Sequence, residues 1–187
     1  MMLDKKEFEK IRKELESFDK NREVVISVSR DVIQISKQII YSIHRGDISG
    51  AQNLISSIKK RLKDLPQDKF DTNMDIVARQ EYVEALCFFE FVKNQRLPSR
   101  KELDVDINPY LLGLCDLTGE LVRFAVNDVI KNKDKGLIYK VKDLVEEIYG
   151  EFLGFNLRNG DLRQKFDSIK WNLKKLEDII YDLELKK

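Results

Sequence analysis

The sequence predicts an all-α protein folded as an antiparallel bundle of six to seven helices. Apolar residues recur at spacings of three and four along nearly the whole chain, as on one face of a helix, and no β-type alternation interrupts them. Only 3 prolines and 8 glycines are present to break helices. Hydrophobic residues make up 42% and charged residues 36%, which is typical of amphipathic helices with charged outer faces. The 187 residues suit a single domain over residues 1–187.

The first predicted helical segment covers residues 8–43, as one long helix or two in line, and ends before Gly46. Its apolar positions are Phe8, Ile11, Leu15, Phe18, Val25, Val28, Val32, Ile35, Ile39 and Ile43. A second helix is predicted over about residues 49–65, and Pro66 stops it because proline cannot continue a helix.

Three further helices are placed by the same apolar spacing and by proline. The third spans about residues 68–94 and is closed by Pro98. The fourth is predicted over about residues 108–131, because Pro109 fits the first turn of a helix. The fifth covers about residues 135–152.

The last helix, over about residues 159–185, has the most regular repeat. Its apolar positions step alternately by four and three through Leu162, Phe166, Ile169, Leu173, Leu176, Ile180 and Leu183. A heptad of this kind requires a partner helix along its whole length. Trp171 lies outside the stripe, and an exposed apolar side chain there favours an oligomeric bundle.

Acidic residues interrupt the apolar stripe of the third helix. That stripe reads Val77, Glu81, Glu84, Phe88 and Phe91, so two carboxylates occupy positions that the pattern gives to buried side chains. A buried, unpaired carboxylate costs several kcal/mol. These two therefore require a proton, a cationic side chain or a metal ion.

The fourth helix carries a polar seam beside its apolar stripe. The stripe consists of Leu114, Leu117, Leu121 and Phe124, and the seam of Asp116, Glu120, Arg123 and Asn127. Glu81 and Glu84 project from one side of the third helix, and Asp116 and Glu120 from one side of the fourth. Four oxygen donors on two neighbouring helices form a candidate site for Mg²⁺ or Mn²⁺, which prefer carboxylates and retain several waters.

Two alternatives for these side chains remain open. Glu81 or Glu84 can form an ion pair with Arg123 or Arg79, and acidic pairs at such spacings are common on solvated helix faces. Arg123 can steady a carboxylate or contact a phosphate. Spacing alone does not decide between a metal site and these structural roles.

A second polar stripe lies on the first helix. Arg30, Gln34, Lys37, Tyr41 and His44 step alternately by four and three, which places cations and an aromatic ring on one face. Such a face can hold backbone phosphates and stack one base of a nucleic acid. The alternatives are an exposed or intersubunit face for the stripe, and for His44 an interaction with the dipole at the helix C-terminus.

Charge is unevenly distributed although the net charge is only +1. Residues 1–70 carry 15 basic and 11 acidic side chains, residues 71–130 carry 6 and 11, and residues 131–187 carry 13 and 11. No apolar run approaches the roughly 18 residues needed to cross a bilayer, and no signal-peptide pattern opens the sequence, so a cytoplasmic protein is expected. Cys87 and Cys115 lie in apolar segments and are expected to be reduced core thiols.

The sequence around the carboxylates resembles the translin family, in particular its translin-associated factor X (TRAX) branch. The similar segments are QEYVEA at residues 80–85, YLLG at 110–113 and DLTGEL at 116–121. SRDV at residues 29–32 and HR at 44–45 are similar to the first helix of the family, and NLRN at 156–159 is closer to translin itself. The likeness runs from about residue 22 to the end of the chain.

This resemblance implies a bundle of the seven-helix type assembled into a hollow octamer, with RNA bound on its inner surface. It also implies Mg²⁺-dependent cleavage of single-stranded or short RNA, with Glu81, Glu84 and Asp116 at the metal-binding catalytic positions. Glu120 is included as a further candidate metal ligand because of its position on the fourth helix, and not because of the resemblance. Because TRAX and translin features are mixed in one chain, a further hypothesis is an ancestral-type subunit that forms homo-oligomers without a separate translin partner.

Three functions follow as hypotheses. The first is an endoribonuclease in which a divalent ion activates water for attack on phosphate. The second is a translin-like protein that binds RNA or single-stranded DNA without cleaving it, and the acidic residues argue against it because they would face phosphate. The third is a helical scaffold without nucleic-acid binding.

Overall fold

Seven helices and no strand make up the parts of the chain that the computed structural model describes, which are residues 3–66, 70–132 and 135–185. The helices are α1 (Lys5–His44), α2 (Ile48–Lys63), α3 (Met74–Asn94), α4 (Arg100–Leu103), α5 (Ile107–Asn132), α6 (Gly136–Leu153) and α7 (Asp161–Leu185). The predicted all-α bundle is therefore confirmed, and α1 is one continuous helix rather than two in line.

One helix boundary differs from the prediction, and one additional short helix is present. The start of the third helix was placed at residue 68, which lies outside the described residues, and α3 begins only at Met74 after the non-helical residues 70–73. The short helix α4 was not predicted. Its signal is a capping box, in which Ser99 Oγ accepts from the Glu102 N–H and the Glu102 carboxylate accepts from the Ser99 N–H.

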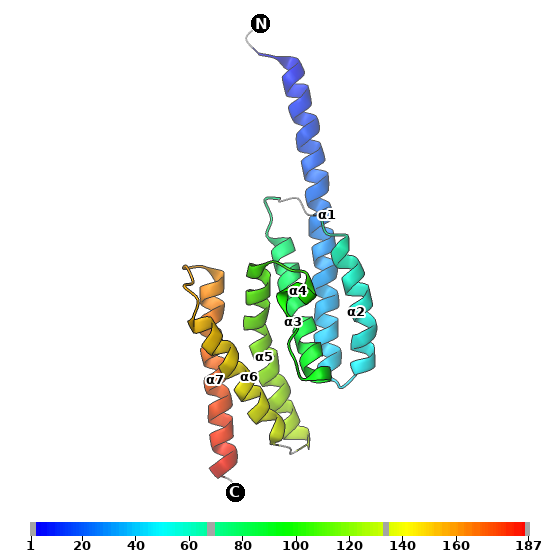
Figure 1. Ribbon diagram of the computed structural model, residues 1–187. Coiled ribbons are helices and arrows are strands. Elements are labelled where there is room, and N and C mark those ends of the chain that lie inside the picture. Colours follow the sequence, from blue (N-terminus) through cyan, green and yellow to red (C-terminus); the bar gives the residue numbers. More distant parts are fainter. Residues whose placement is uncertain (1–2, 67–69, 133–134, 186–187) are drawn as a thin grey trace.

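The helices that form the centre of the molecule run side by side in the order α1, α3, α5 and α7 (Figure 1). All four run in the same direction. Gln80 meets Asp116 and Phe88 meets Phe124, and both pairs are 36 residues apart, so α3 and α5 are parallel and in register. The segment 95–106, which contains α4, carries the chain back to the end at which α5 begins.

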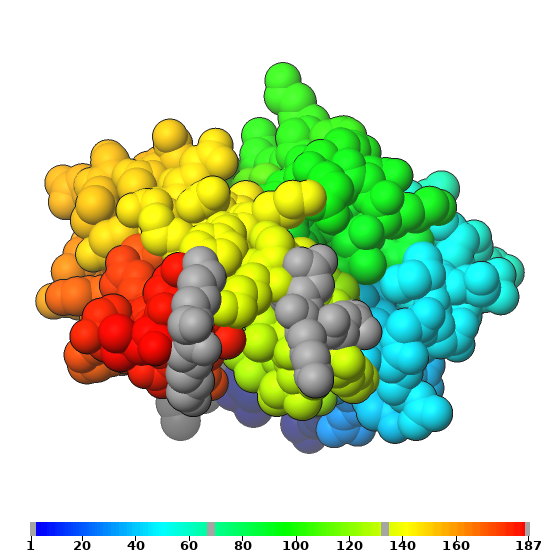
Figure 2. Space-filling view, turned by 90° about the horizontal axis from the view of Figure 1, so that it is seen from below, coloured from blue at the N-terminus to red at the C-terminus, as the bar shows by residue number. Residues whose placement is uncertain are grey.

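Antiparallel packing occurs between helices that follow one another in the chain. Helix α2 packs on α1, and α6 packs on both α5 and α7. Seen along the helices, α6 and α7 lie on one side, α1 and α2 on the other, and α5 between them (Figure 2). The partner that the α7 heptad requires is therefore supplied by α5 and α6, against which Phe166, Ile169 and Leu176 are buried.

The first part of α1 extends beyond the bundle (Figure 1). The apolar side chains of Phe8, Ile11 and Leu15 are exposed there. From Val25 onward the same stripe is buried against α2 and α3. Trp171 is 68% exposed on α7, as predicted.

Both cysteines are buried and free, which confirms their prediction as core thiols. Within the described residues, no helix is long and apolar enough to cross a membrane.

Gly113 allows α5 to approach α3 closely. A Cβ atom built there would lie 2.7 Å from Val83 Cβ and 2.8 Å from the carbonyl oxygen of Gln80. A backbone oxygen cannot move aside as a flexible side chain can, so a larger residue would force the two helices apart. Gly113 therefore fixes the distance between the helices that carry the acidic residues.

We expect Gly113→Ala to lower the free energy of unfolding by about 1–3 kcal/mol, because the added methyl group overpacks the contact between α3 and α5. Gly150→Ala in α6 is the matched control, since nothing lies within 4 Å of its Cβ position. That change should raise stability by up to about 1 kcal/mol. Urea denaturation of both variants measures the difference, and equal effects would contradict the close approach at Gly113.

Candidate functional site

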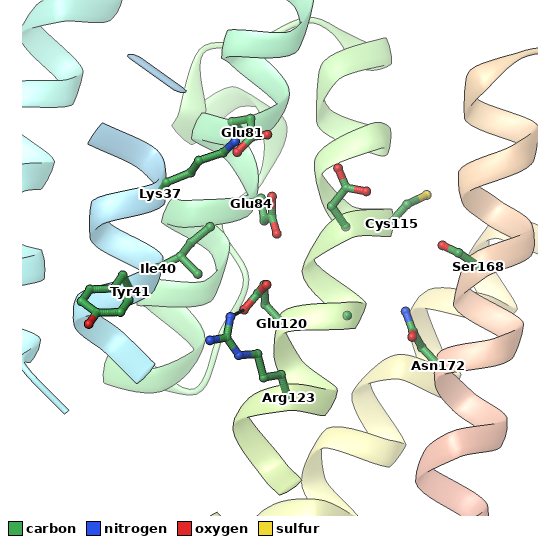
Figure 3. A pocket seen from close by; sticks show the side chains of 12 residues that line it. Lys37, Ile40, Tyr41, Glu81, Glu84, Cys115, Glu120, Arg123, Ser168 and Asn172 are labelled. Atoms are coloured by element: carbon green, nitrogen blue, oxygen red, sulfur yellow. Dashed lines mark hydrogen bonds and ion pairs between the residues drawn. The ribbon is translucent and has the colours of Figure 1, made fainter. Parts of the chain in front are cut away.

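A cavity of about 580 Å³ lies between α1, α3, α5 and α7, and all four predicted acidic residues line it (Figure 3). Glu81 and Glu84 come from α3, and Asp116 and Glu120 from α5. The remaining lining residues are Lys37, Ile40, Tyr41, Cys115, Gly119, Arg123, Ser168 and Asn172. The parallel register of α3 and α5 thus gathers the acidic residues on one wall of the cavity, as the sequence predicted.

Glu84 is the most deeply placed of these carboxyl groups, with 8% of the residue exposed. Burial raises the pKa of Glu84 to about 9, and the nearby Asp116, Glu81 and Glu120 add to the effect. Burial also raises the pKa of Glu81, although Lys37 opposes this. Within the described part of the chain, neither glutamate forms an ion pair or hydrogen bond through its side chain. The alternative pairing with Arg79 or Arg123 is therefore not formed.

Asp116 is satisfied by two groups that the sequence analysis did not single out. The Lys165 ammonium on α7 lies 2.5 Å from Asp116 Oδ1 and 2.7 Å from Oδ2. Gln80 Nε2 on α3 donates to Oδ2 over 2.5 Å. Asp116 is therefore tied to both neighbouring helices.

Glu120 is paired with His44, whose Nε2 hydrogen-bonds to Glu120 Oε2. The His44 side chain is only 5% exposed and lies against the rings of Phe88 and Phe124. Its Nδ1 is buried without a partner among the described residues, so the proton belongs on Nε2. The bond from His44 lowers the pKa of Glu120, with a smaller contribution from Arg123.

His44 therefore differs from both predicted roles. It is in the last turn of α1, but its ring points inward to Glu120 rather than out to a nucleic acid or to the helix end. The other members of the stripe, Arg30, Gln34, Lys37 and Tyr41, are exposed and line a shallow groove along α1. Lys37 and Tyr41 line both this groove and the acidic cavity, so the two surfaces are continuous.

Carboxylate oxygens are the donors that Mg²⁺ and Mn²⁺ prefer, and a buried carboxyl group without a partner, such as Glu84, gains from a nearby cation. The donor set therefore fits a divalent ion. In the described regions, however, no three acidic, histidine or cysteine side chains already stand close enough to hold one. Lys165 on Asp116 and His44 on Glu120 occupy oxygens that a metal would use.

Comparison with known proteins places the chain in a family. Residues 20–187 match the Translin family. The chain belongs to this family. A translin-associated protein X homologue of Schizosaccharomyces pombe is 29% identical over 202 residues, covering 94% of this chain and 86% of that protein. The resemblance to TRAX that the sequence predicted is thus confirmed.

Solved structures of similar fold carry the name C3PO. The apo-NeC3PO structure has a TM-score of 0.80 and 30% sequence identity, and covers 97% of this chain and 98% of its own. A complex of AfC3PO with duplex RNA has a TM-score of 0.85 and 23% identity, with the same coverage. At that identity the second likeness shows the fold alone.

The residues of this Translin-family site that sequence reasoning missed are Gln80, Lys165, Ser168 and Asn172. Three of them lie on α7, more than 40 positions after Glu120. Only packing of α7 on α5 brings Ser168 and Asn172 to the cavity and Lys165 to Asp116. A sequence signal exists for Lys165, which directly precedes Phe166 of the heptad stripe and so lies at the edge of the buried face.

Without metal, stability should fall as pH rises from about 5 to about 9. The folded state keeps the Glu84 proton up to a pKa of about 9, whereas the unfolded chain loses it near 4.5, so the folded state binds more protons between these values. The slope from this one group is at most about 1.4 kcal/mol per pH unit.

Glu84→Gln should flatten this profile, because an amide mimics the protonated acid and does not titrate. Urea denaturation in EDTA at several pH values measures the slope, with exposed Glu16→Gln as the control. A Glu84→Gln profile parallel to that of the wild type would contradict the buried, protonated carboxyl group.

Proposed function

We propose that this protein is a Mg²⁺- or Mn²⁺-dependent endoribonuclease that acts on single-stranded or short RNA. The observation that carries the proposal is the buried, unpaired Glu84 carboxyl group on an open cavity shared with Glu81, Asp116 and Glu120. A helical scaffold would gain nothing from this arrangement, because it costs stability without a cation. Membership in the Translin family and likeness to C3PO support a role with RNA.

Glu81, Glu84 and Asp116 would hold the ion, and Glu120 would serve as a further ligand. A bound divalent ion supplies a water of lowered pKa and neutralises charge on the scissile phosphate. His44 holds the Glu120 carboxylate in place through its Nε2. Phe88 and Phe124 pack against the His44 ring. Attack by water on the phosphodiester gives products with 5′-phosphate and 3′-hydroxyl ends.

The RNA strand would reach the cavity along the exposed stripe of α1. Arg30 and Lys37 place two cations on this face, and the Tyr41 ring, 58% exposed, offers a surface on which a base can stack. Arg123, which lies 3.5 Å from Glu120 and is largely exposed, has free donors for a phosphate. The AfC3PO complex contains duplex RNA, so single-stranded and duplex substrates both belong in the test.

A homo-oligomer, expected from resemblance to be an octamer, would enclose this surface. Trp171, Tyr181 and Leu185 are each at least 65% exposed on α7, which leaves apolar area for another subunit. Single-stranded DNA is a further candidate ligand. The specific rival is a protein that binds nucleic acid without cleaving it, because Lys165 and His44 already occupy two of the four carboxylates.

With Mg²⁺ or Mn²⁺, the wild-type protein should cleave a labelled single-stranded RNA, and EDTA should abolish cleavage. Glu84→Gln should lower the rate roughly 100-fold or more, since loss of a metal ligand removes several kcal/mol of transition-state stabilisation. Glu16→Gln, at an exposed position of α1 remote in sequence from the site residues, should cleave like the wild type. Denaturing gels with end analysis measure both rate and products. Equal cleavage by wild type and Glu84→Gln would exclude this site.

RNA binding in EDTA should depend on salt and on the α1 stripe. Replacing Arg30 and Lys37 together by Gln should weaken binding and reduce the slope of log K against log salt by about 1–2, because each lost phosphate contact removes a little less than one unit. Filter binding from about 50 to about 200 mM KCl, a range over which phosphate contacts lose much of their affinity, measures the slope. A slope unchanged from the wild type would place the RNA elsewhere.

A further inference from the structure

Lys165 lies closer to Asp116, at the edge of the acidic cavity, than Arg123 lies to Glu120. It extends from α7 to α5 and approaches both oxygens of Asp116, at 2.5 and 2.7 Å. Its side chain is 34% exposed and that of Asp116 is 24% exposed, so neither is sealed in the core. The pair can therefore open without unfolding the bundle.

The ammonium occupies both oxygens of Asp116, which are the atoms that would coordinate a metal ion. Gln80 donates to Oδ2 at the same time, so Asp116 already has donors on both oxygens. A divalent ion and an ammonium at the same oxygens would repel each other strongly. Binding of a divalent ion to Asp116 is therefore favoured when the Lys165 ammonium moves away from it.

The pair of Lys165 and Asp116 also borders a second cavity. This cavity, of about 940 Å³, adjoins the first through Asp116 and Ser168 and is lined by Lys165 itself and Arg158. A lysine stem is long and flexible, and its head is a strongly hydrated point charge that follows the nearest anion. The wall of this cavity is largely apolar and also carries Asp161, but its two cations, Lys165 and Arg158, suit the phosphates of a strand that continues past the acidic site.

We propose that Lys165 is an exchangeable counter-ion, which pairs with Asp116 in the metal-free site and transfers to an RNA phosphate when a divalent ion binds. This inference rests on the proposed function and deepens it. Because the same ammonium serves Asp116 or the phosphate, RNA draws it away from Asp116 and raises the affinity for metal. By linkage, the metal raises the affinity for RNA by the same factor.

Calorimetric titration with MnCl₂ in the absence of RNA tests the first half. Lys165→Met should bind Mn²⁺ about two- to five-fold more tightly than the wild type, because a partly exposed competing ion pair is lost. Lys165→Arg, which keeps the charge, and Lys174→Met, on the exposed face of α7, should both bind like the wild type. A residue with only a structural role would not tighten metal binding when removed.

Binding of a non-cleavable single-stranded RNA in MnCl₂ tests the second half, because the Lys165 ammonium has then left Asp116. Lys165→Met should bind single-stranded RNA more weakly and lose about one unit of salt slope. Unchanged Mn²⁺ affinity or unchanged RNA binding in Lys165→Met overturns the inference about Lys165. The proposed function still stands in that case, provided that the wild-type protein binds Mn²⁺. A wild-type protein that binds no Mn²⁺ removes both, and a Glu84→Gln protein that binds it as well as the wild type removes the proposed site.

Discussion

The parallel contact between α3 and α5 is the constraint on which the rest of this structure depends. Gly113 lets the two backbones approach until a Cβ atom no longer fits, and this close packing holds them in one register. That register places Gln80 against Asp116 and Phe88 against Phe124. The acidic residues at and between these two contacts therefore line one cavity. A looser contact would leave the same side chains on two separate solvated faces.

The outer helices limit the electrostatic cost of this arrangement. Four carboxyl groups on one cavity repel each other, and burial adds to the cost for Glu84, whose proton is retained to a pKa of about 9. Helix α1 contributes His44 to Glu120, and α7 contributes Lys165 to Asp116. The site is therefore a product of all four parallel helices. Glu81 and Glu84 are the two carboxyl groups left without a cationic partner among the described residues, so a cation gains most beside them.

Much of the fold and part of the site could be predicted from the sequence. Glu81 and Glu84 stood out because they interrupt a heptad-like apolar stripe, and a cost of that kind requires a compensating partner. The partners themselves could not be predicted, because Lys165 and His44 lie on helices that reach the cavity only through tertiary packing. His44 was misplaced for a related reason. Its position fits the polar stripe of α1. The side chain nevertheless turns toward the core, because its acidic partner Glu120 lies there.

Crystals soaked in MnCl₂ would test the central claim most directly, through anomalous difference density collected near the manganese absorption edge. We expect a peak inside the cavity, within coordination distance of Glu84 and of at least one oxygen of Glu81 or Asp116. The Lys165 ammonium should have moved away from Asp116. A cavity without a peak at a saturating Mn²⁺ concentration, with Lys165 still on Asp116, would contradict it.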